Sequence, residues 1–278
     1  MLKAIRFVKK FFMHLILVVW CISVGMIFYW LIVASLKDNK TVFRELWALP
    51  EKLDFSNYVN AWNSLNFARY SLNSFIVVTS SLIILLFIST LAAYAITRMK
   101  IRFANPLTYF FIAGMGIPSQ LLFVPMYKIL ISIKLIDTLG GLVLVYVAWS
   151  IPFTVFLLTG FFLTIPSELE DAAFMDGCSE FKTFYKIIIP MAAPGILTGA
   201  IFNFIGLWNE FMIALIFTTD PNNKTMALGL YHLQASLQYT SDWGSIFAGA
   251  VMVLIPTAIV FLVLADRLIS GITFGAIK

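Results

Sequence analysis

Residues 167–190 read SELEDAAFMDGCSEFKTFYKIIIP and stand between two long apolar runs. The stretch begins with acids, has one glycine near its middle and ends on a proline. Ser167 and Glu170 fit the S-x-x-E capping box, which predicts a helix that starts at Ser167. Gly177 stands where a helix commonly stops. The sequence therefore predicts a short capped helix inside a polar loop, residues 164–190, of a hydrophobic chain.

The polar loop is expected to contain two helices with distinct faces. Small residues flanked by acids share one face of the first helix, at Leu169, Ala172, Ala173 and Asp176. Ser179 predicts the cap of the second helix. One side of this second helix carries Phe181, Phe184, Tyr185 and Ile188. These features fit a connector on a membrane surface and a docking element equally well, although the small residues, which permit close backbone approach, slightly favour docking.

The composition places the chain among integral membrane proteins. Of its 278 residues, 61% are hydrophobic and 12% are charged, whereas a soluble domain has about 25% charged residues. The net charge of +5 fits lysines and arginines that flank membrane spans, and no arginine patch interleaved with aromatics indicates nucleic-acid binding. Two cysteines are too few for a disulfide framework or a metal site.

Six segments are apolar and long enough to cross a bilayer as helices. They lie at about 13–36, 73–96, 107–130, 139–163, 192–217 and 246–269. The predicted fold is therefore all-α, an integral membrane protein of six transmembrane helices in one domain over residues 1–278, with the polar loop between spans four and five.

The distribution of positive charge predicts the orientation in the bilayer. Cytoplasmic loops are enriched in lysine and arginine, which places the N-terminus and the loop with Arg98, Lys100 and Arg102 inside. The C-terminus and the polar loop then also lie in the cytoplasm. Two long segments, residues 37–70 and 219–245, are predicted to lie outside.

At the polar loop the chain resembles a known family. A pattern in this loop resembles the cytoplasmic Glu-Ala-Ala loop of ATP-binding-cassette (ABC) importer permeases. The pattern is Asp171-Ala172-Ala173, then three residues, Gly177, nine residues, and finally Ile187-x-Ile189-Pro190. Asp171 stands where the family usually has Glu, and Ile189 where it has Leu. The resemblance implies a coupling helix that sits in a cleft of an ATP-binding subunit. It assigns that role to Glu170, Asp171, Ala172, Ala173, Asp176 and Gly177.

The resemblance extends along most of the chain and indicates a carbohydrate importer. The stretches concerned include FSNYVNAW at 55–62, AAYAITRMKIRF at 92–103, GIPSQLLFVPMY at 116–127, WNEF at 208–211, DWG at 242–244 and GITFGAIK at 271–278. They resemble the shorter permease of maltose-type transporters, although Ala265-Asp266-Arg267 departs from the family pattern. The resemblance implies import of a sugar, expected to be an oligosaccharide, across a bacterial cell membrane.

The same resemblance implies the partners. They are a second homologous permease, ATP-binding subunits and an extracellular or periplasmic sugar-binding protein. ATP and Mg²⁺ would be bound by the ATP-binding subunits and no cofactor by this chain, which has no G-x-x-x-x-G-K-[ST] phosphate loop. The chain is thus expected to be a transport subunit and not an enzyme.

Candidate pathway and contact residues follow from polarity. The fifth span carries Asn203, Asn209 and Glu210, and ionisable residues in spans indicate function. Glu210 lies about 24 Å along the helix from Pro194, so a brace or gate is favoured over sugar contact. In the resembling maltose system the other permease holds most of the sugar. The predicted contacts with the binding protein lie in the outer segment, at Asn222, Asn223 and Tyr231.

The sequence bears on three other functions. An ion-coupled secondary transporter usually shows inverted repeats and charges near the midplane, and neither is evident here. A metalloprotease would need an H-E-x-x-H pair, whereas His14 and His232 are far apart. An ABC importer for a solute other than sugar remains the alternative within the same family.

Overall fold

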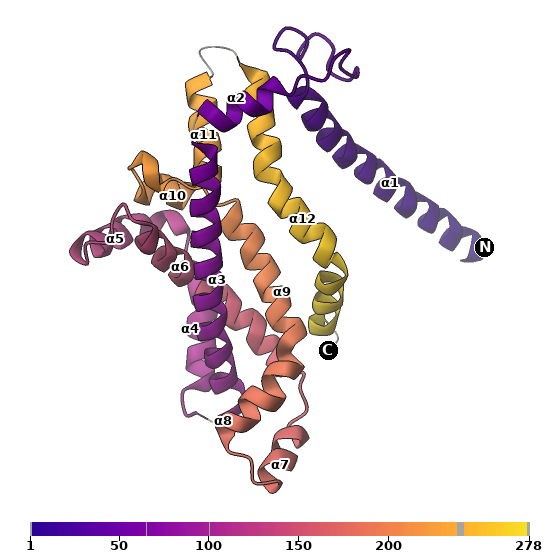
Figure 1. Cartoon of the computed structure of the whole chain (residues 1–278). Coiled ribbons are helices and arrows are strands. Elements are labelled where there is room, and N and C mark those ends of the chain that lie inside the picture. The colour runs from indigo at the N-terminus through magenta and orange to yellow at the C-terminus, as the bar shows by residue number, and fades with distance from the viewer. Residues whose placement is uncertain (1, 65, 100, 238–241, 277–278) are drawn as a thin grey trace. The chain divides into compact units, whose positions relative to one another are not determined.

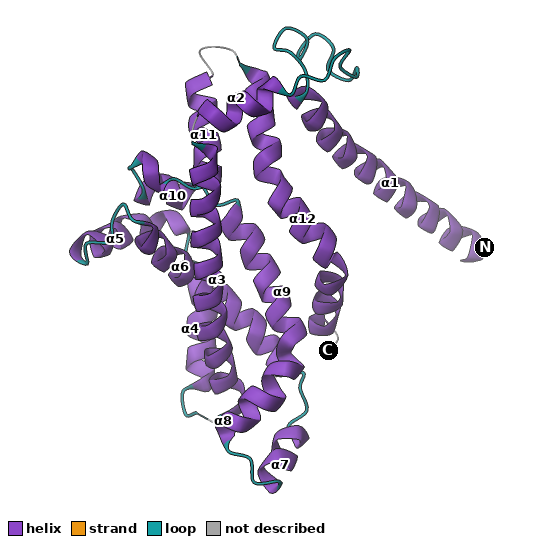
Figure 2. Ribbon diagram, in the orientation of Figure 1, coloured by secondary structure: helices purple, strands orange, loops and turns teal. Residues whose placement is uncertain are grey.

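The computed structural model of the chain describes residues 2–64, 66–99, 101–237 and 242–276, with side chains placed from Arg6 to Arg267. Within these ranges the chain forms helices and loops and no strand (Figure 2). Figure 1 labels the helices in chain order. The prediction of an all-α fold is confirmed.

The chain divides into two compact units. The first unit comprises Met1–Phe67 and Leu230–Leu254, and the second comprises Ala68–Gly229 and Ile255–Lys278. Three helices therefore pass from one unit to the other, namely α3 (Phe67–Arg98), α11 (Met226–Leu237) and α12 (Trp243–Ala276). The single transmembrane domain expected over residues 1–278 stays a prediction.

The first unit brings together two stretches that are far apart in the sequence. It contains α1 (Leu2–Ser35) and α2 (Ser56–Ser64) with parts of α11 and α12. The buried Asn57 amide donates to the backbone carbonyls of Ser35 and Lys37, at 3.0 and 2.8 Å. A Cβ added to Gly244 would lie 2.6 Å from that amide, so the glycine of DWG lets α12 approach the asparagine of FSNYVNAW.

The second unit holds the polar loop and most of the predicted spans. Its remaining elements are α4 (Ala104–Met115), α5 (Ser119–Ser132), α6 (Leu139–Phe162), α7 (Glu168–Met175), α8 (Glu180–Thr183), the π-helical turn η1 (Phe184–Ile188), α9 (Ile189–Trp208), α10 (Met212–Phe217) and the 3₁₀ turn η2 (Pro221–Asn223). Across the described part of both units, five helices are long and apolar enough to cross a membrane, and the bent pair α4–α5 makes a sixth if it is one span.

The third predicted span, residues 107–130, is not a continuous helix. Helices α4 and α5 meet at a bend of 103°. Pro118 supplies no backbone N–H for a helix, and a residue that precedes proline disfavours helical backbone. Helix α4 accordingly ends at Gly116, and α5 starts after Pro118.

The fifth predicted span, residues 192–217, is not one continuous helix, because it is broken near its C-terminal end. The helical stretch runs from Glu180 to Trp208 and includes the π turn. The chain breaks at Asn209–Phe211, and α10 follows as a separate short helix. The Glu210 carboxylate accepts the backbone N–H groups of Ile213 and Ala214, at 2.7 and 3.2 Å. It thereby caps α10 instead of continuing α9.

An apolar core fixes the end of the unit that carries the polar loop. It joins α3, α6, η1 and α9 through buried side chains at Ala93, Tyr94, Leu158, Phe162, Ile165, Phe184, Ile188 and Ala192. The Tyr94 and Phe184 rings lie 4.6 Å apart between centroids. The polar loop is therefore anchored to three long helices through one cluster.

Candidate functional site

The first helix of the polar loop starts at Ser167 as predicted, with Ser167 as its N-cap residue, but it lacks the predicted capping box. Helix α7 begins at Glu168, and the Ser167 side chain makes no capping hydrogen bond because its backbone is already helical, with φ of −68° and ψ of −22°. The Glu170 carboxylate, which the box would turn back towards Ser167, instead accepts from the Arg98 guanidinium at 3.2 Å. The bond to Arg98 joins two opposite charges, whereas the capping bond would join the carboxylate to an uncharged backbone N–H.

Arg98 ties the end of α3 to both ends of the turn between α6 and α7. Besides Glu170, its guanidinium donates to the backbone carbonyls of Phe162 and Ile165. These carbonyls lie at and just beyond the C-terminus of α6, where cations are favoured by the helix dipole. Arg98 and Glu170 side chains are each 10% exposed, so this is a largely desolvated pair.

The six predicted coupling residues do not share one surface. Glu170 and Ala173 are buried against the rest of the chain, with 8% and 4% of their surface exposed. Asp171, Ala172 and Asp176 are exposed, as is Gly177. Burial of Glu170 and Ala173 fixes α7 in place, and the exposed residues are left for another molecule.

The predicted stop at Gly177 is confirmed. Gly177 adopts φ of +75°, a left-handed conformation that glycine favours. Its N–H donates to the Phe174 carbonyl at 3.0 Å, and the Cys178 N–H donates to the Ala173 carbonyl at 2.9 Å. This pair of bonds is the Schellman motif. The helix end is thus satisfied within the loop itself.

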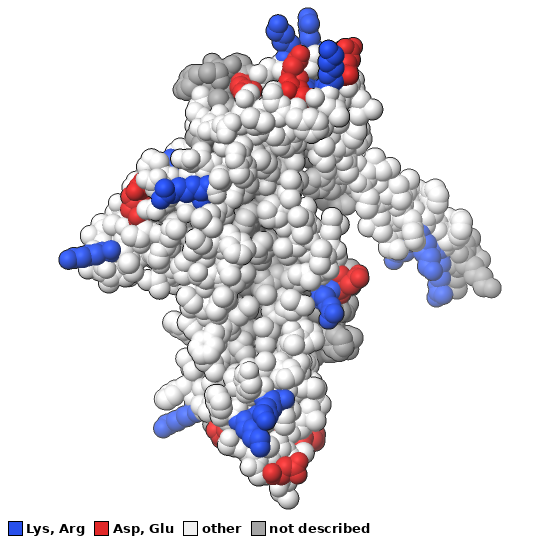
Figure 3. Space-filling model, in the orientation of Figure 1, with Lys and Arg blue, Asp and Glu red and all other residues white. Residues whose placement is uncertain are grey.

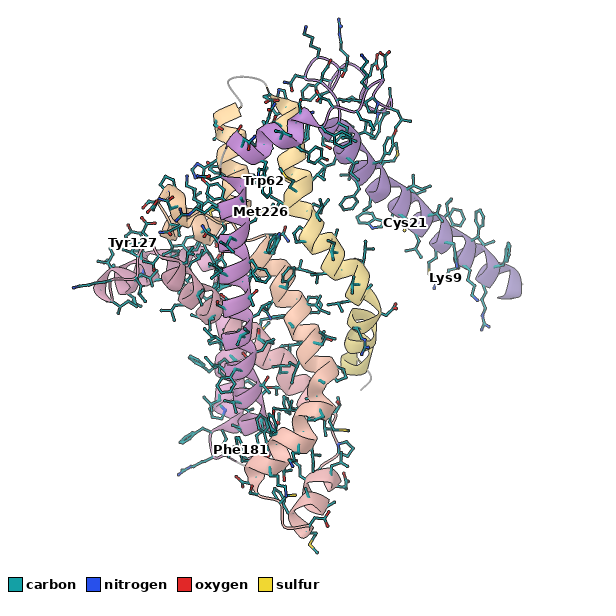
Figure 4. All side chains as sticks on the ribbon, in the orientation of Figure 1. Lys9, Cys21, Trp62, Tyr127, Phe181 and Met226 are labelled. Atoms are coloured by element: carbon teal, nitrogen blue, oxygen red, sulfur yellow. The ribbon has the colours of Figure 1, made fainter. Side chains whose placement is uncertain are left out.

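The predicted apolar side of the second helix is only half buried. Ser179 caps α8 as predicted, by accepting from the Lys182 N–H. Phe184 and Ile188 are buried, whereas Phe181 and Tyr185 are 77% and 64% exposed; Figure 4 labels Phe181 beside α8. The π-helical turn η1 widens the helix just before Pro190, which cannot donate a backbone bond. The wider turn changes which side chains face the core.

A pocket of about 450 Å³ lies beside α7. Its wall includes Arg98 together with three acids, Glu170, Asp171 and Glu180. On the face seen in Figure 3, charged side chains gather where α7 and α8 lie, and the surface of the long helices next to them is uncharged. The exposed acids of α7 therefore belong to a surface of mixed charge, where Lys or Arg side chains lie near Asp and Glu side chains (Figure 3).

The predicted pathway residues of the fifth span separate into two groups. One pocket of about 300 Å³ is lined by Asn203 and Glu210, together with Gly206 and Leu207. The Glu210 carboxylate also accepts from the Tyr146 hydroxyl of α6 at 3.0 Å, which gives it the contacts of a brace. Asn209 lies outside this pocket and donates instead to Thr257 of α12 at 3.1 Å.

Two predicted contacts with a binding protein, Asn222 and Asn223, lie in the second unit. Hydrogen bonds hold their segment against the rest of that unit. The Asn222 carbonyl accepts from Arg69 and Asn73 of α3, at 3.1 and 2.8 Å. The Asn223 amide donates to the Asp137 carbonyl at 2.6 Å. The Asn222 side chain itself is exposed, so it remains available for contact.

Tyr231, the third predicted contact residue, lies in the first unit. It is 44% exposed and packs edge-on against the ring of His232. Lys100 of the predicted cytoplasmic loop lies outside the described residues. At the C-terminus α12 continues to Ala276, through most of the stretch at 271–278.

Two organising residues were not identified from the sequence. Arg98 was counted only as a cytoplasmic charge, yet it holds the polar loop. Asp137 was not singled out at all; its carboxylate accepts from the N–H and hydroxyl of Thr219 and from the Asp220 N–H. Two sequence features could have indicated these residues. Arg98 stands at the very end of a span, and Asp137 directly precedes Thr138, the N-cap of α6.

These features define a class of protein: an all-helical, multi-span membrane protein with a helical polar loop between two of its spans. The model of the family described as "Binding-protein-dependent transport system inner membrane component" matches residues 85–273. The chain belongs to this family of transporter permeases.

Several relatives resemble nearly the whole chain. The diacetylchitobiose uptake system permease protein of Streptomyces coelicolor is 33% identical over 265 residues, which cover 95% of this chain and 88% of the relative. The trehalose transport system permease protein of Mycobacterium tuberculosis is 33% identical, and the trehalose/maltose transport system permease protein of Thermococcus litoralis is 34% identical, each with 90% of both chains covered.

A solved structure shows the same fold. A chain of the bacterial ABC transporter that imports the acidic polysaccharide alginate superposes with a TM-score of 0.81, at 19% identity, over 93% of this chain and 96% of that chain. This likeness concerns the fold alone. The family model and the named relatives confirm the predicted membership of the ABC importer permeases.

Proposed function

We propose that this chain is a permease subunit of an ABC importer for a sugar, in the cell membrane of a bacterium. Together with a second, homologous permease it forms the pathway across the bilayer. The observation that carries the proposal is the polar loop, where the Glu-Ala-Ala-type motif forms a short helix that ends in a Schellman motif, with Asp171 and Ala172 exposed. Family membership supports the same function.

The sugar assignment is supported by the named relatives. They are permeases for diacetylchitobiose, trehalose and trehalose or maltose, and each matches at least 90% of this chain. These solutes are all short oligosaccharides, so a disaccharide or a slightly longer oligosaccharide is the proposed cargo. The alternative, a solute other than sugar, has no comparable support.

ATP hydrolysis in separate subunits would drive the import. The exposed part of α7, with Leu169, Ala172 and Met175 between the acids, offers an apolar strip with an acidic margin. An ATP-binding subunit would dock there, and the chain itself would hold neither ATP nor Mg²⁺. ATP binding would draw the coupling helices of the two permeases together and turn the pathway outward.

The outer segment would receive the sugar-loaded binding protein. Asn222 presents an exposed side chain on a backbone fixed by hydrogen bonds, and Tyr231 is partly exposed. Asn203 and Glu210 lie in the pocket between α6 and α9, where they would serve the pathway, and Asn209 would brace α12. Coupling requires that the two pathway states differ in affinity for these partners.

The proposal is tested with the complete transporter, purified through a tag on this chain. An Ala172→Arg variant places a long charged side chain on the exposed face of α7 and is expected to abolish co-purification of the ATP-binding subunit. Ser132→Arg adds the same side chain at an exposed position at the end of α5 and serves as the matched control. Undiminished ATPase recovery with Ala172→Arg would refute docking on α7.

A further inference from the structure

The second helix of the polar loop presents aromatic and basic side chains that do not pack against the chain. Phe181 and Tyr185, one turn apart, are 77% and 64% exposed. Lys182 and Lys186, which directly follow them in the sequence, are exposed as well. The opposite side of the same stretch is buried, because Phe184 belongs to the apolar core. The stretch α8–η1 therefore has one face that holds it to the protein and one that points away from it.

The two lysines of this outward face lack acidic partners in the chain. Within the part of the chain that the structure describes, the one ion pair formed is that between Arg98 and Glu170. Glu180, the acid nearest to the lysines in the sequence, is exposed and pairs with neither of them. Both ammonium groups are therefore available to pair with negative charge on another molecule.

The length of the helix places this face at the edge of the bilayer. The continuous helical stretch runs from Glu180 to Trp208, 29 residues. Its second part, α9, has 20 residues, about 30 Å at 1.5 Å per residue, which equals the thickness of the hydrocarbon core. The charges that bracket α9 in the sequence are Lys186 and Glu210. The stretch α8–η1 therefore extends beyond the core into the headgroup layer, about 5–8 Å thick on each side.

The headgroup layer favours side chains of these two kinds. Aromatic rings concentrate at membrane interfaces, where they lie at the level of the headgroups. Lysine covers apolar surface with its stem and extends its ammonium group to the polar layer. An anionic surface attracts each lysine with a gain in affinity of roughly fivefold. The exposed rings and the unpaired ammonium groups of α8–η1 thus both match lipid.

The connection between α3 and α4 repeats the pattern. Phe103 is 62% exposed, and the guanidinium carbon of Arg102 lies 5.9 Å from the centroid of its ring. Figure 1 shows this connection and α8 at the end of the second unit that carries α7. Two separate segments at this end therefore present an exposed aromatic ring with a cation beside it.

Helix α7 differs from this face in charge. It exposes three acids, Glu168, Asp171 and Asp176, and contains no lysine or arginine. An anionic lipid would be repelled by α7 and attracted by the lysines of α8–η1. The two helices of the polar loop are therefore suited to different partners.

We infer that the outward face of α8–η1, formed by Phe181, Lys182, Tyr185 and Lys186, binds anionic phospholipid headgroups of the leaflet next to the polar loop. The rings enter the boundary between headgroups and acyl chains, and the ammonium groups pair with lipid phosphates. The lipid holds the start of α9 at a fixed depth, while α7 projects beyond the membrane. The inference goes beyond the proposed function and requires only that the chain spans a membrane.

The test places a photo-crosslinker on this face in the complete transporter. The benzophenone amino acid p-benzoylphenylalanine replaces Phe181 in one variant and Met175 in the control, since Met175 is 89% exposed at the end of α7. Each transporter is assembled in nanodiscs of phosphatidylcholine and phosphatidylglycerol, with one lipid radiolabelled at a time, and irradiated. We expect the probe at position 181 to capture lipid, and the probe at position 175 to capture the ATP-binding subunit.

Charge variants test the preference for anionic lipid. In an equimolar mixture, the probe at position 181 is expected to capture more phosphatidylglycerol than phosphatidylcholine. The double variant Lys182→Gln, Lys186→Gln should lower that ratio by roughly tenfold. Salt near 1 M, where the Debye length is about 3 Å, should lower it as well. Lys134→Gln removes an exposed lysine beyond α5 and should leave the ratio unchanged.

The outcomes separate this inference from the proposed function. Capture of a protein subunit in place of lipid at position 181, or of no lipid at all, would overturn the lipid surface. Equal capture of the two lipids, or a ratio that the double variant leaves unchanged, would overturn the anionic preference. Failure of the probe at position 175 to capture an ATP-binding subunit would count against docking on α7, whatever position 181 captures.

Discussion

Gly177 shows how one residue ends the helix that carries the coupling motif. Its φ of +75° is left-handed, and a Cβ there would meet nothing within 4 Å. The penalty for Gly177→Ala is therefore conformational alone, about 1–2 kcal/mol. We expect this variant to lower the apparent Tm in detergent and to expose the loop to protease, and Gly177→Asn to lose less. The control is Gly160→Ala, where a Cβ also meets nothing and no left-handed φ is required; an equal loss at Gly160 would contradict the explanation.

Asp137 makes the attachment of the predicted outer segment, residues 219–245, depend on pH. Burial raises the pKa of its carboxyl, but hydrogen bonds from Asp220, Thr219 and Asn223 outweigh burial and hold the pKa below the ordinary 3.8. A depressed native pKa stabilises the folded state above the unfolded pKa, and this stabilisation is lost as pH falls through the native value. We expect hydrogen exchange at Thr219 and Asp220 to accelerate as pH falls from about 4 towards 2, after correction for the intrinsic exchange rate. In Asp137→Asn the exchange should be faster throughout and lack this acid step; an acid step that persists in the variant would assign it to another group.

At the scale of elements, the Arg98–Glu170 pair joins α3 to α7. Removing one partner of a buried ion pair costs about 3–5 kcal/mol, because a charge is left uncompensated, whereas replacing both by apolar residues is often neutral. We expect Arg98→Met and Glu170→Met each to lower the apparent Tm and the yield of assembled transporter. The double variant should recover much of the Tm, although the carbonyls of Phe162 and Ile165 also lose their donor. A double variant as unstable as the sum of the single ones would show that the pair is not coupled.

Local sequence predicts an element correctly when residues close to it in the sequence determine its structure. Apolar length predicted the helical fold, and Gly177 and Ser179 predicted the ends of short helices. The capping box at Ser167 failed because Glu170 pairs with Arg98, which lies 72 residues away in sequence. The third span is divided into two helices by a bend of 103°. Proline at 118 is compatible with a bend, but hydropathy does not give its size. The sequence does not show which of its 27 phenylalanines line the pocket between α6 and α9, because the pocket forms only where these two helices meet.

At the scale of the whole second unit, α3 joins the two surfaces that the proposed function uses. Within residues 67–98 it contains neither glycine nor proline, whereas α5, α6, α9 and α12 each contain an internal proline. One end bonds to the polar loop through Arg98. Near its other end Asn73 and Ser74 bond to the outer segment, at Asn222, Lys224 and Met226. Figure 1 shows α3 as one uninterrupted helix. A straight helix fixed at both ends transmits displacement, and coupling between sites is reciprocal.

This arrangement predicts that weakening the outer attachment of α3 reduces communication between the binding protein and the ATPase. Asn73→Ala removes two hydrogen bonds, to the carbonyls of Asn222 and Lys224, each worth about 0.6 kcal/mol in membrane proteins. We expect the ratio of ATPase activity with sugar-loaded binding protein to activity without it to fall roughly fivefold in proteoliposomes, as the loss of about 1 kcal/mol implies. Phe87→Leu, on an exposed part of α3, should keep the wild-type ratio. If hydrogen exchange shows the outer segment released in Asn73→Ala while the ratio stays at the wild-type value, α3 does not carry the signal, and another helix of this unit must do so.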